Sequence, residues 1–299
     1  MKKYLLSLTF AIAVASASLA QRTPQASPGA TIIQSVGITD FTVKYSRPGI
    51  KGRAVFADKS PIAPIGQLWR TGANQPTIFE SSTDFTFGDK KVPAGKYSLF
   101  SIPEKAKWTV ILNKNLTAST DVYKETEDIA RIEVTPVSGE SSESFQISFS
   151  DITDSTSLMN IAWGTVKVPV KLSMATQELT ITSLDKAVQD KPEDVATLQS
   201  AAGYFLSKNI DLRKALSLAD KAIGLKEGWS NLWIKAQILD KMGKTAEALP
   251  IAQKALTVGA AAPDGAYDFY KTQIAKGIAD MQAKVPVKEV VGKGKKKKK

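Results

Sequence analysis

The sequence predicts an α+β protein of more than one domain, in which an antiparallel, jelly-roll-like β-sandwich is followed by a small α-helical repeat domain. Two observations lead to this prediction. Short runs of alternating apolar and polar residues fill residues 30 to 172, which is the pattern of half-buried strands. From about residue 176 onward the apolar residues follow a helical period. We therefore expect a β-sandwich over residues 21–175 and helices over residues 176–285.

Strands are expected where Thr, Val, Ile, Phe and Tyr alternate with polar residues between turn signals. Such runs include DFTVKYS, TIFESSTDFTF, KYSLFSI, KWTVILN, ARIEVTPV, SFQISFS and GTVKVPVKL. About eight strands at this spacing are typical of a sandwich or jelly roll. The stretch from Pro48 to Gly66 is rich in proline and glycine and has no strand pattern. It predicts a long loop, and long loops on a rigid scaffold often carry a binding site.

The helical part contains an internal repeat. Four pairs of small residues are each separated by 33 positions, namely Gly203 and Ala236, Ala215 and Ala248, Ala219 and Ala252, and Ala222 and Ala255. A fixed period of this length indicates stacked helical hairpins. The small residues and the turn GKTAEAL resemble the tetratricopeptide repeat, with LDKAVQDKPED as part of a degenerate earlier repeat and residues 264–285 as a capping helix. We expect these repeats to offer a surface for a protein partner.

The N-terminus predicts export. Residues 1–20, MKKYLLSLTFAIAVASASLA, combine a basic start, an apolar run and small residues before Gln21, which are the features of a secretory signal peptide. The run is too short to span a membrane, and no later segment approaches ~20 apolar residues. We expect no transmembrane segment and a secreted, periplasmic protein. Since the chain has no cysteine, its stability must come from buried cores without disulfides.

The positive charge lies mainly at the ends of the chain. The net charge is +11, but two lysines belong to the signal peptide and six to the C-terminal GKGKKKKK, which leaves +3 for the body. A dense run of like charges repels itself, so we expect residues 286–299 to form a disordered Lys-rich tail. Such a tail is suited to contact an anionic surface.

Missing residue types exclude several kinds of chemistry. Without histidine or cysteine the chain has no Ser-His or Cys-His nucleophile pair and no His/Cys metal site. We expect no metal site and no cofactor, and a binding protein in preference to an enzyme. One alternative stays open, a carbohydrate-active hydrolase that uses paired carboxylates. The acids that could meet across loops for this purpose are Asp121, Glu125, Glu127, Asp128, Asp151 and Asp154.

The candidate ligand site lies on two segments that bracket the long loop, YSRPGIKGR and LWRTGANQPT. They concentrate cations, aromatic rings and amide or hydroxyl groups, which together suit an anionic or carbohydrate-like ligand. The candidate residues, with one arginine from a later strand, are Arg47, Lys51, Arg53, Trp69, Arg70, Thr71, Asn74 and Arg131. A structural interpretation is also open. In it the arginines bond backbone carbonyls or nearby aspartates, and Trp69 belongs to the core.

The same segments carry a family resemblance. YSRPGIKGR, RTGANQPT, PAGKYSLF and WTVILNK follow one another in this order, with Arg131 after them. Residues 27–172 thereby resemble the family known as domain of unknown function 2911, a group of secreted bacterial proteins. The resemblance implies a shared fold and a secreted address, and it implies no activity. The helical part lies outside it.

Overall fold

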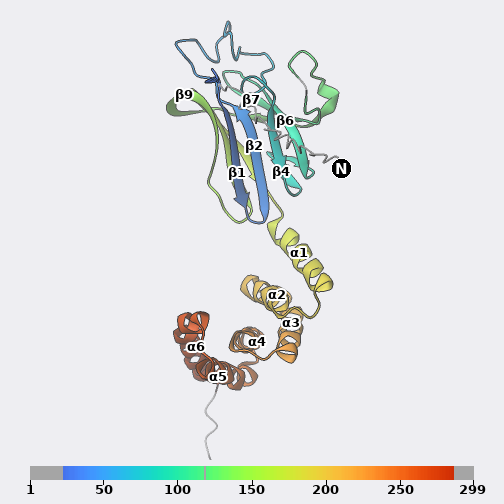
Figure 1. Cartoon of the computed structure of the whole chain (residues 1–299), viewed down its shortest axis with the longest axis vertical. Coiled ribbons are helices and arrows are strands. Elements are labelled where there is room, and N and C mark those ends of the chain that lie inside the picture. Colours follow the sequence, from blue (N-terminus) through green and yellow to red (C-terminus); the bar gives the residue numbers. More distant parts are fainter. Residues whose placement is uncertain (1–22, 118, 286–299) are drawn as a thin grey trace, which may run out of the picture. The chain divides into compact units, whose positions relative to one another are not determined.

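The computed structural model describes residues 23–117 and 119–285. The predicted signal peptide and Lys-rich tail lie outside the described residues. By its internal contacts the chain divides between Thr176 and Gln177 into a β unit and a helical unit. As predicted, the first unit is made of antiparallel sheets and the second of helices (Figure 1).

The β unit has a six-stranded and a four-stranded antiparallel sheet. The six-stranded sheet has the order β1 (Gly29–Val36), β2 (Thr39–Ser46), β3 (Thr77–Ser81), β6 (Gly95–Ile102), β7 (Trp108–Asn113) and β8 (Asp128–Val134). The four-stranded sheet has the order β5 (Lys90–Val92), β4 (Phe85–Phe87), β10 (Thr156–Ser173) and β9 (Val137–Ser150). Each predicted run falls on one or two of these strands, while β1 and the short β5 were not among the predicted runs.

Both sheets bury their apolar side chains in one core, as the alternation of the sequence requires. In β2, for example, Phe41, Val43 and Tyr45 are buried, while the residues between them face outward. The same hydrophobic cluster includes Ile147 from β9 and Met159 from β10. The six-stranded sheet therefore has an inner face toward the core and an outer face away from it.

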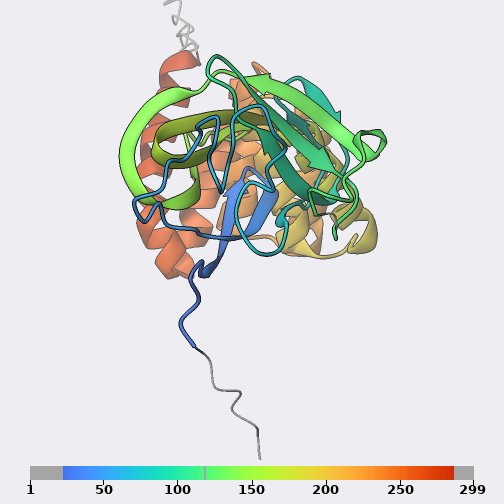
Figure 2. The same ribbon diagram turned by 90° about the horizontal axis from the view of Figure 1, so that it is seen from above.

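The longest strands, β9 and β10, form a curved pair. Their register shifts on both sides of Gly164, whose φ of 58° is a left-handed conformation that suits glycine. Figure 2 shows the strong bend of β9, in bright green. Across the sheet, β10 also pairs with β4, where Leu172 lies opposite Phe87 and Ser173 opposite Thr86. The short strand β4, from the middle of the sequence of this unit, thus pairs with β10, the last strand of the unit.

The connection from Arg47 to Pro76 contains the long loop predicted over Pro48 to Gly66 and extends ten residues beyond it. It begins where β2 ends and winds over that end of the sheets (Figures 1 and 2). Two isolated bridges fasten it, one between Gly49 and Ser144 of β9 and one between Trp69 and Ser101 of β6. The loop is therefore attached to both sheets.

The helical unit contains six helices among the described residues. They are α1 (Thr176–Asp190), α2 (Val195–Lys208), α3 (Leu212–Leu225), α4 (Trp229–Lys241), α5 (Thr245–Ala261) and α6 (Gly265–Lys284). Side chains of Asp194, Asp211 and Asp264 cap the first turns of α2, α3 and α6. Consecutive helices from α2 to α6 pack against one another.

Alanines fill the contacts between these helices. Ala215, Ala219 and Ala222 of α3 are almost completely buried, and so are their counterparts 33 positions later, Ala248, Ala252 and Ala255 of α5. Three of the four residue pairs that define the sequence repeat therefore have equivalent burial, whereas Gly203 of α2 is only half-buried and its counterpart Ala236 of α4 is completely buried. None of the described helices is long and apolar enough to cross a membrane.

Candidate functional site

The structure separates the eight predicted site residues into two groups. Seven of them, from Arg47 to Asn74, lie on the loop between β2 and β3. Arg131 lies in β8, at the opposite edge of the six-stranded sheet from β1. The predicted residues therefore do not form a single pocket.

Two residues of the loop group belong to the interior. Trp69 is 3% exposed and its ring stacks on that of Trp163, with centroids 5.9 Å apart. Its indole N–H donates to the carbonyl of Gly72 at 3.1 Å. Thr71 is completely buried and its hydroxyl bonds that of Ser101 at 2.9 Å. Trp69 is thus a core residue, as the structural interpretation of the sequence expects.

The loop arginines bond backbone carbonyls. Arg47 donates to the carbonyl of Phe145 at 3.1 Å. Arg53 donates to Ile50 at 3.0 Å and to Gly49 at 2.6 Å, and Arg70 donates to the carbonyl of Asn74 at 2.6 Å. Guanidinium groups in these positions fix the path of the loop, because each carbonyl gains a charged donor.

The other two polar residues of the loop also contact protein groups. The backbone N–H of Lys51 donates to the carboxylate of Glu143 at 2.8 Å. The side-chain amide of Asn74 donates to the carbonyl of Ser27 at 3.2 Å and to the hydroxyl of Ser46 at 3.3 Å. Asn74 has a φ of 60°, which asparagine tolerates better than most residues. Together with Arg70 it holds the turn that leads into Gln75 and Pro76.

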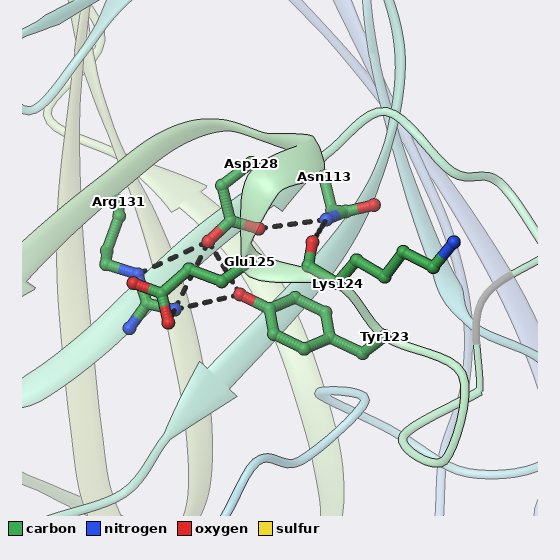
Figure 3. Close-up of polar contacts among 6 residues, drawn as sticks. All are labelled: Asn113, Tyr123, Lys124, Glu125, Asp128 and Arg131. Atoms are coloured by element: carbon green, nitrogen blue, oxygen red, sulfur yellow. Dashed lines mark hydrogen bonds and ion pairs between the residues drawn. The ribbon is translucent and has the colours of Figure 1, made fainter.

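Arg131 is the centre of a polar network (Figure 3). Its guanidinium lies 3.2 Å from Asp128 and 3.3 Å from Glu125, and it donates to the hydroxyl of Tyr123 at 2.8 Å. Tyr123 in turn donates to Asp128 at 2.6 Å, and the amide of Asn113 donates to the other oxygen of Asp128 at 2.9 Å. The network ties the segment before β8 to the sheet.

The charges of this network are those of a structural ion-pair cluster and differ from those of a catalytic carboxylate pair. Burial, the hydrogen bond to Asp128 and the charge of Asp128 together raise the pKa of Tyr123, so its phenol stays protonated and keeps donating. Glu125 and Asp128 are close enough to be a carboxylate pair, but both contact the same guanidinium nitrogen of Arg131. A glycosidase pair instead needs one protonated carboxyl that can act as an acid. The arrangement therefore offers little support for the hydrolase alternative.

A groove of about 410 Å³ lies on the outer face of the six-stranded sheet. Its floor is a row of three residues that lie side by side on adjacent strands, because Thr31 pairs with Lys44 and Lys44 pairs with Ile78. Their neighbours Val43 and Phe79 are buried in the core, so this row faces away from it. We call this site the outer-face groove; its floor and walls include Thr31, Lys44, Ser46, Gln75, Ile78 and Leu116.

Two loop segments form the walls of the outer-face groove. At one wall stand Gln75 and Pro76, from the family-specific segment RTGANQPT. At another stands Leu116, whose neighbour Asn115 accepts a hydrogen bond through its carbonyl from Ser98 of β6 at 2.8 Å. The predicted residues Arg70 and Asn74 thus support a wall of the groove without lining it.

Lys44 gives the outer-face groove its charge. Its neighbour Glu80 pairs with Lys96 at 3.5 Å, and among residues 23–117 and 119–285 no carboxylate forms an ion pair with Lys44. Sequence reasoning missed this lysine, since it occupies an ordinary outward position of the strand DFTVKYS. Only the register between three strands places it beside Thr31 and Ile78.

Two comparisons with known proteins bear on this unit. Residues 27–172 match the family model described as "Protein of unknown function (DUF2911)". The match confirms the predicted resemblance over the same residues, and it ends before the helical unit. A comparison with curated proteins gives no match. Within the part of the chain that the structure describes, no group of three or more acidic residues is arranged to hold a metal ion.

Proposed function

We propose that this protein is a non-enzymatic ligand-binding protein, whose two sheets form a β-sandwich that binds a small organic anion in the outer-face groove. The observation that carries the proposal is Lys44, a cation without an ion-pair partner among the described residues, at the floor of a walled groove. Lysine is well suited to pair with a carboxylate or sulfonate. Thr31, Ser46 and Gln75 add hydrogen-bonding groups beside it.

The rest of the groove suits an apolar body on the same ligand. Pro76, Ile78 and Leu116 line it, and the side chain of Leu116 is 40% exposed. A site with apolar walls and a few directed polar groups is typical of small-molecule recognition. The ligand class that fits is therefore an amphipathic anion, with one acidic group and a hydrocarbon or ring portion.

The test uses 8-anilinonaphthalene-1-sulfonate, a fluorescent amphipathic anion, titrated into the purified protein. Lys44→Gln should weaken its binding about fivefold, which corresponds to about 1 kcal/mol for a partly exposed ion pair. The neutral analogue N-phenyl-1-naphthylamine lacks the sulfonate, so its binding should be unchanged. Ile78→Asp should weaken both probes, because it places a charge in the apolar part of the groove.

Lys96→Gln is the matched control. Lys96 lies on the same face of the same sheet, but it pairs with Glu80 and does not line the groove. Equal binding of the sulfonate by the unchanged protein and by Lys44→Gln would contradict the proposal. An equal loss in Lys44→Gln and Lys96→Gln would also contradict it, because general surface charge would then explain the binding.

For the helical unit we propose a tetratricopeptide-like array that binds a protein partner. A groove of about 580 Å³ supports this proposal, since it is lined by residues of α2, α4 and α6, including Leu206, Trp233, Gln237 and Lys276. The equivalent burial of alanines in α3 and α5 supports the repeat. We also propose that residues 1–20 direct export and that the protein is periplasmic. The lysine tail would contact an anionic surface there.

A further inference from the structure

A second groove of the β unit lies beside the tryptophans of the core. It has a volume of about 390 Å³, a size typical of small-molecule sites. We call it the indole groove, because the indole of Trp108 lines it. Its other lining residues come from the long loop, the turn between β6 and β7, the start of β9 and the middle of β10, namely Phe56, Ile65, residues 103–105, residues 136–138 and residues 165–166.

The indole N–H of Trp108 has no hydrogen-bond acceptor among the described residues. Three tryptophans meet in this core, and the N–H groups of Trp69 and Trp163 donate to the carbonyls of Gly72 and Glu143, each at 3.1 Å. Trp108 is buried to the same degree, with 2% of its surface exposed, yet its N–H donates to no residue that the structure describes. A buried indole N–H usually has an acceptor. This donor is therefore left for another molecule.

The N–H of Trp108 opens onto the indole groove. In the described parts of the chain, the fully enclosed side-chain nitrogen and oxygen atoms without a partner are the Oδ1 atoms of Asn160 and Asn231. The indole nitrogen of Trp108 is not among them, so it reaches the surface although the ring is buried. Since Trp108 lines the groove, a molecule in the groove has access to this donor.

Phe56 forms the wall beside Trp108. The two rings meet edge to face with centroids 4.7 Å apart, and Phe56 also contacts Trp69 and Trp163. The backbone of Phe56 has a φ of 54°, a left-handed conformation that is unfavourable for a bulky residue. Strain of this kind persists where surrounding contacts hold it, and it is common at ligand sites. The three tryptophan contacts therefore fix this wall before a ligand enters.

The rest of the lining suits a neutral apolar molecule. Ile65, Val137 and Val166 supply aliphatic walls. The charged residues of the lining, Glu104 and Lys105, are exposed neighbours of opposite sign. Their charges offset each other, so the lining favours neither an anion nor a cation. This is the opposite of the outer-face groove.

We propose that the indole groove is a second ligand site of the β unit and binds a small neutral carbonyl compound with an apolar ring. The carbonyl oxygen accepts the N–H of Trp108, and the ring packs against Phe56 and Val137. This ligand differs in charge from the amphipathic anion of the outer-face groove, and the site does not depend on the function proposed there. An ordinary explanation also exists, in which the N–H donates to solvent and the groove has no ligand.

The experiment uses two probes of nearly the same shape with the whole purified protein labelled with ¹⁵N. Acetophenone has a carbonyl where α-methylstyrene has a CH₂ group. The chain has five tryptophans, and NMR titration follows their indole N–H signals, with that of Trp108 identified by its loss in Trp108→Phe. Acetophenone should bind saturably and move the Trp108 signal downfield, as a new hydrogen bond does, whereas α-methylstyrene should not.

Trp108→Phe separates the hydrogen bond from the apolar contacts. It keeps a ring but removes the donor, so it should weaken acetophenone about fivefold, the effect of one ordinary hydrogen bond, and leave α-methylstyrene unchanged. The matched control is Trp163→Phe. Trp163 is buried and contacts the same Phe56, but it does not line the groove, so both probes should bind to this variant as before.

A substitution at the protein surface tests the apolar wall without disturbing the core. Val137→Asp should weaken both probes at least about tenfold, because their rings would lie against a charge. Ile152→Asp is its control, since Ile152 is 46% exposed against 47% for Val137 and does not line the groove. Lys44→Gln in the outer-face groove should leave acetophenone binding unchanged.

Three results would overturn the proposal. The first is the absence of saturable acetophenone binding. The second is binding that leaves the Trp108 signal in place. The third is a loss of acetophenone binding in Trp163→Phe, Ile152→Asp or Lys44→Gln as large as in the groove variants, because the probe would then bind elsewhere or without specificity.

Discussion

The two units of this protein differ in the side chains at their internal contacts, although the helical unit also buries rings such as Trp233 and Tyr267. The β unit buries large rings, and the ring of Trp69 contacts those of Trp108, Trp163 and Phe145. The helical unit buries alanines at its helix contacts, where three positions of α3 recur in α5. The difference shows that substitutions which change side-chain volume are tolerated differently at the two kinds of contact. A core of large rings is damaged when a side chain is made smaller, and a close helix contact is damaged when one is made larger.

The largest effect is expected from Trp69→Ala in the β unit. Removing a buried indole that stacks on Trp163 leaves a cavity and an unpaired carbonyl at Gly72, which should cost about 3 to 5 kcal/mol of unfolding free energy. The measurement is a urea denaturation of the whole chain followed by tryptophan fluorescence.

Arg70→Gln is the control for that measurement, since Arg70 is adjacent in sequence and only partly buried. It removes one hydrogen bond to the carbonyl of Asn74 and should cost about 1 kcal/mol. If the two variants lost similar amounts of unfolding free energy, Trp69 would contribute no more than a loop hydrogen bond does. That result would contradict the contrast drawn between the two units.

An intermediate effect is expected from Ala248→Leu in the helical unit. Ala248 is completely buried between packed helices, so the added carbons should overpack the contact and cost about 1 to 3 kcal/mol. Thermal unfolding followed by the helical circular dichroism signal measures it. Ala260→Leu, on the exposed side of the same helix, should leave the midpoint unchanged; a shift equal to that of Ala248→Leu would argue against close packing at the repeat position.

The smallest effect concerns pH and Asp240 of α4. Burial disfavours its charge, but hydrogen bonds from Lys284 of α6 and from Thr245 outweigh burial, so the pKa of Asp240 is lowered. A lowered pKa in the folded state adds stability above the ordinary carboxyl pKa, and this is lost as pH falls through the lowered pKa.

The measurement compares the thermal midpoints of the unchanged protein and of Asp240→Asn from neutral to acidic pH. The unchanged protein should be more stable at neutral pH, and the difference should vanish in acid. Lys284→Gln should show a smaller pH-dependent difference of the same sign, because it removes the strongest donor to Asp240. A difference that stays constant with pH would contradict the role assigned to this ion pair.

Much of the fold could be predicted because strand and helix periods are local properties of the sequence. The run DFTVKYS became β2, and KYSLFSI became β6, which ends at Ile102 before Pro103. β5 has three residues, too few to show a period. In β1 the inward positions include Gln34, so its alternation is weak.

The site was harder to predict because it depends on which residues become neighbours. A loop arginine can bond a ligand or a carbonyl, and the choice between them is made by the path of the chain. For Arg47, Arg53 and Arg70 the structure gives carbonyls. Lys44 is the opposite case, a residue that lines the groove although it was not predicted to. Nothing in its local sequence distinguishes it, and strand register alone brings it to the floor of the outer-face groove. The outer-face groove is thus a product of strand arrangement.

The pairing of β4 with β10 affects the order in which the chain acquires structure. Thr86 reaches its partner only when Ser173 is present, so the four-stranded sheet has to close a long stretch of chain before it gains its central contacts. The helices of the second unit pack on their immediate neighbours and close short loops. High contact order slows folding, and a half-made sheet exposes its strand edges meanwhile. The β unit is therefore expected to fold more slowly than the helical unit and to be more prone to aggregation while it folds, although it is synthesised first.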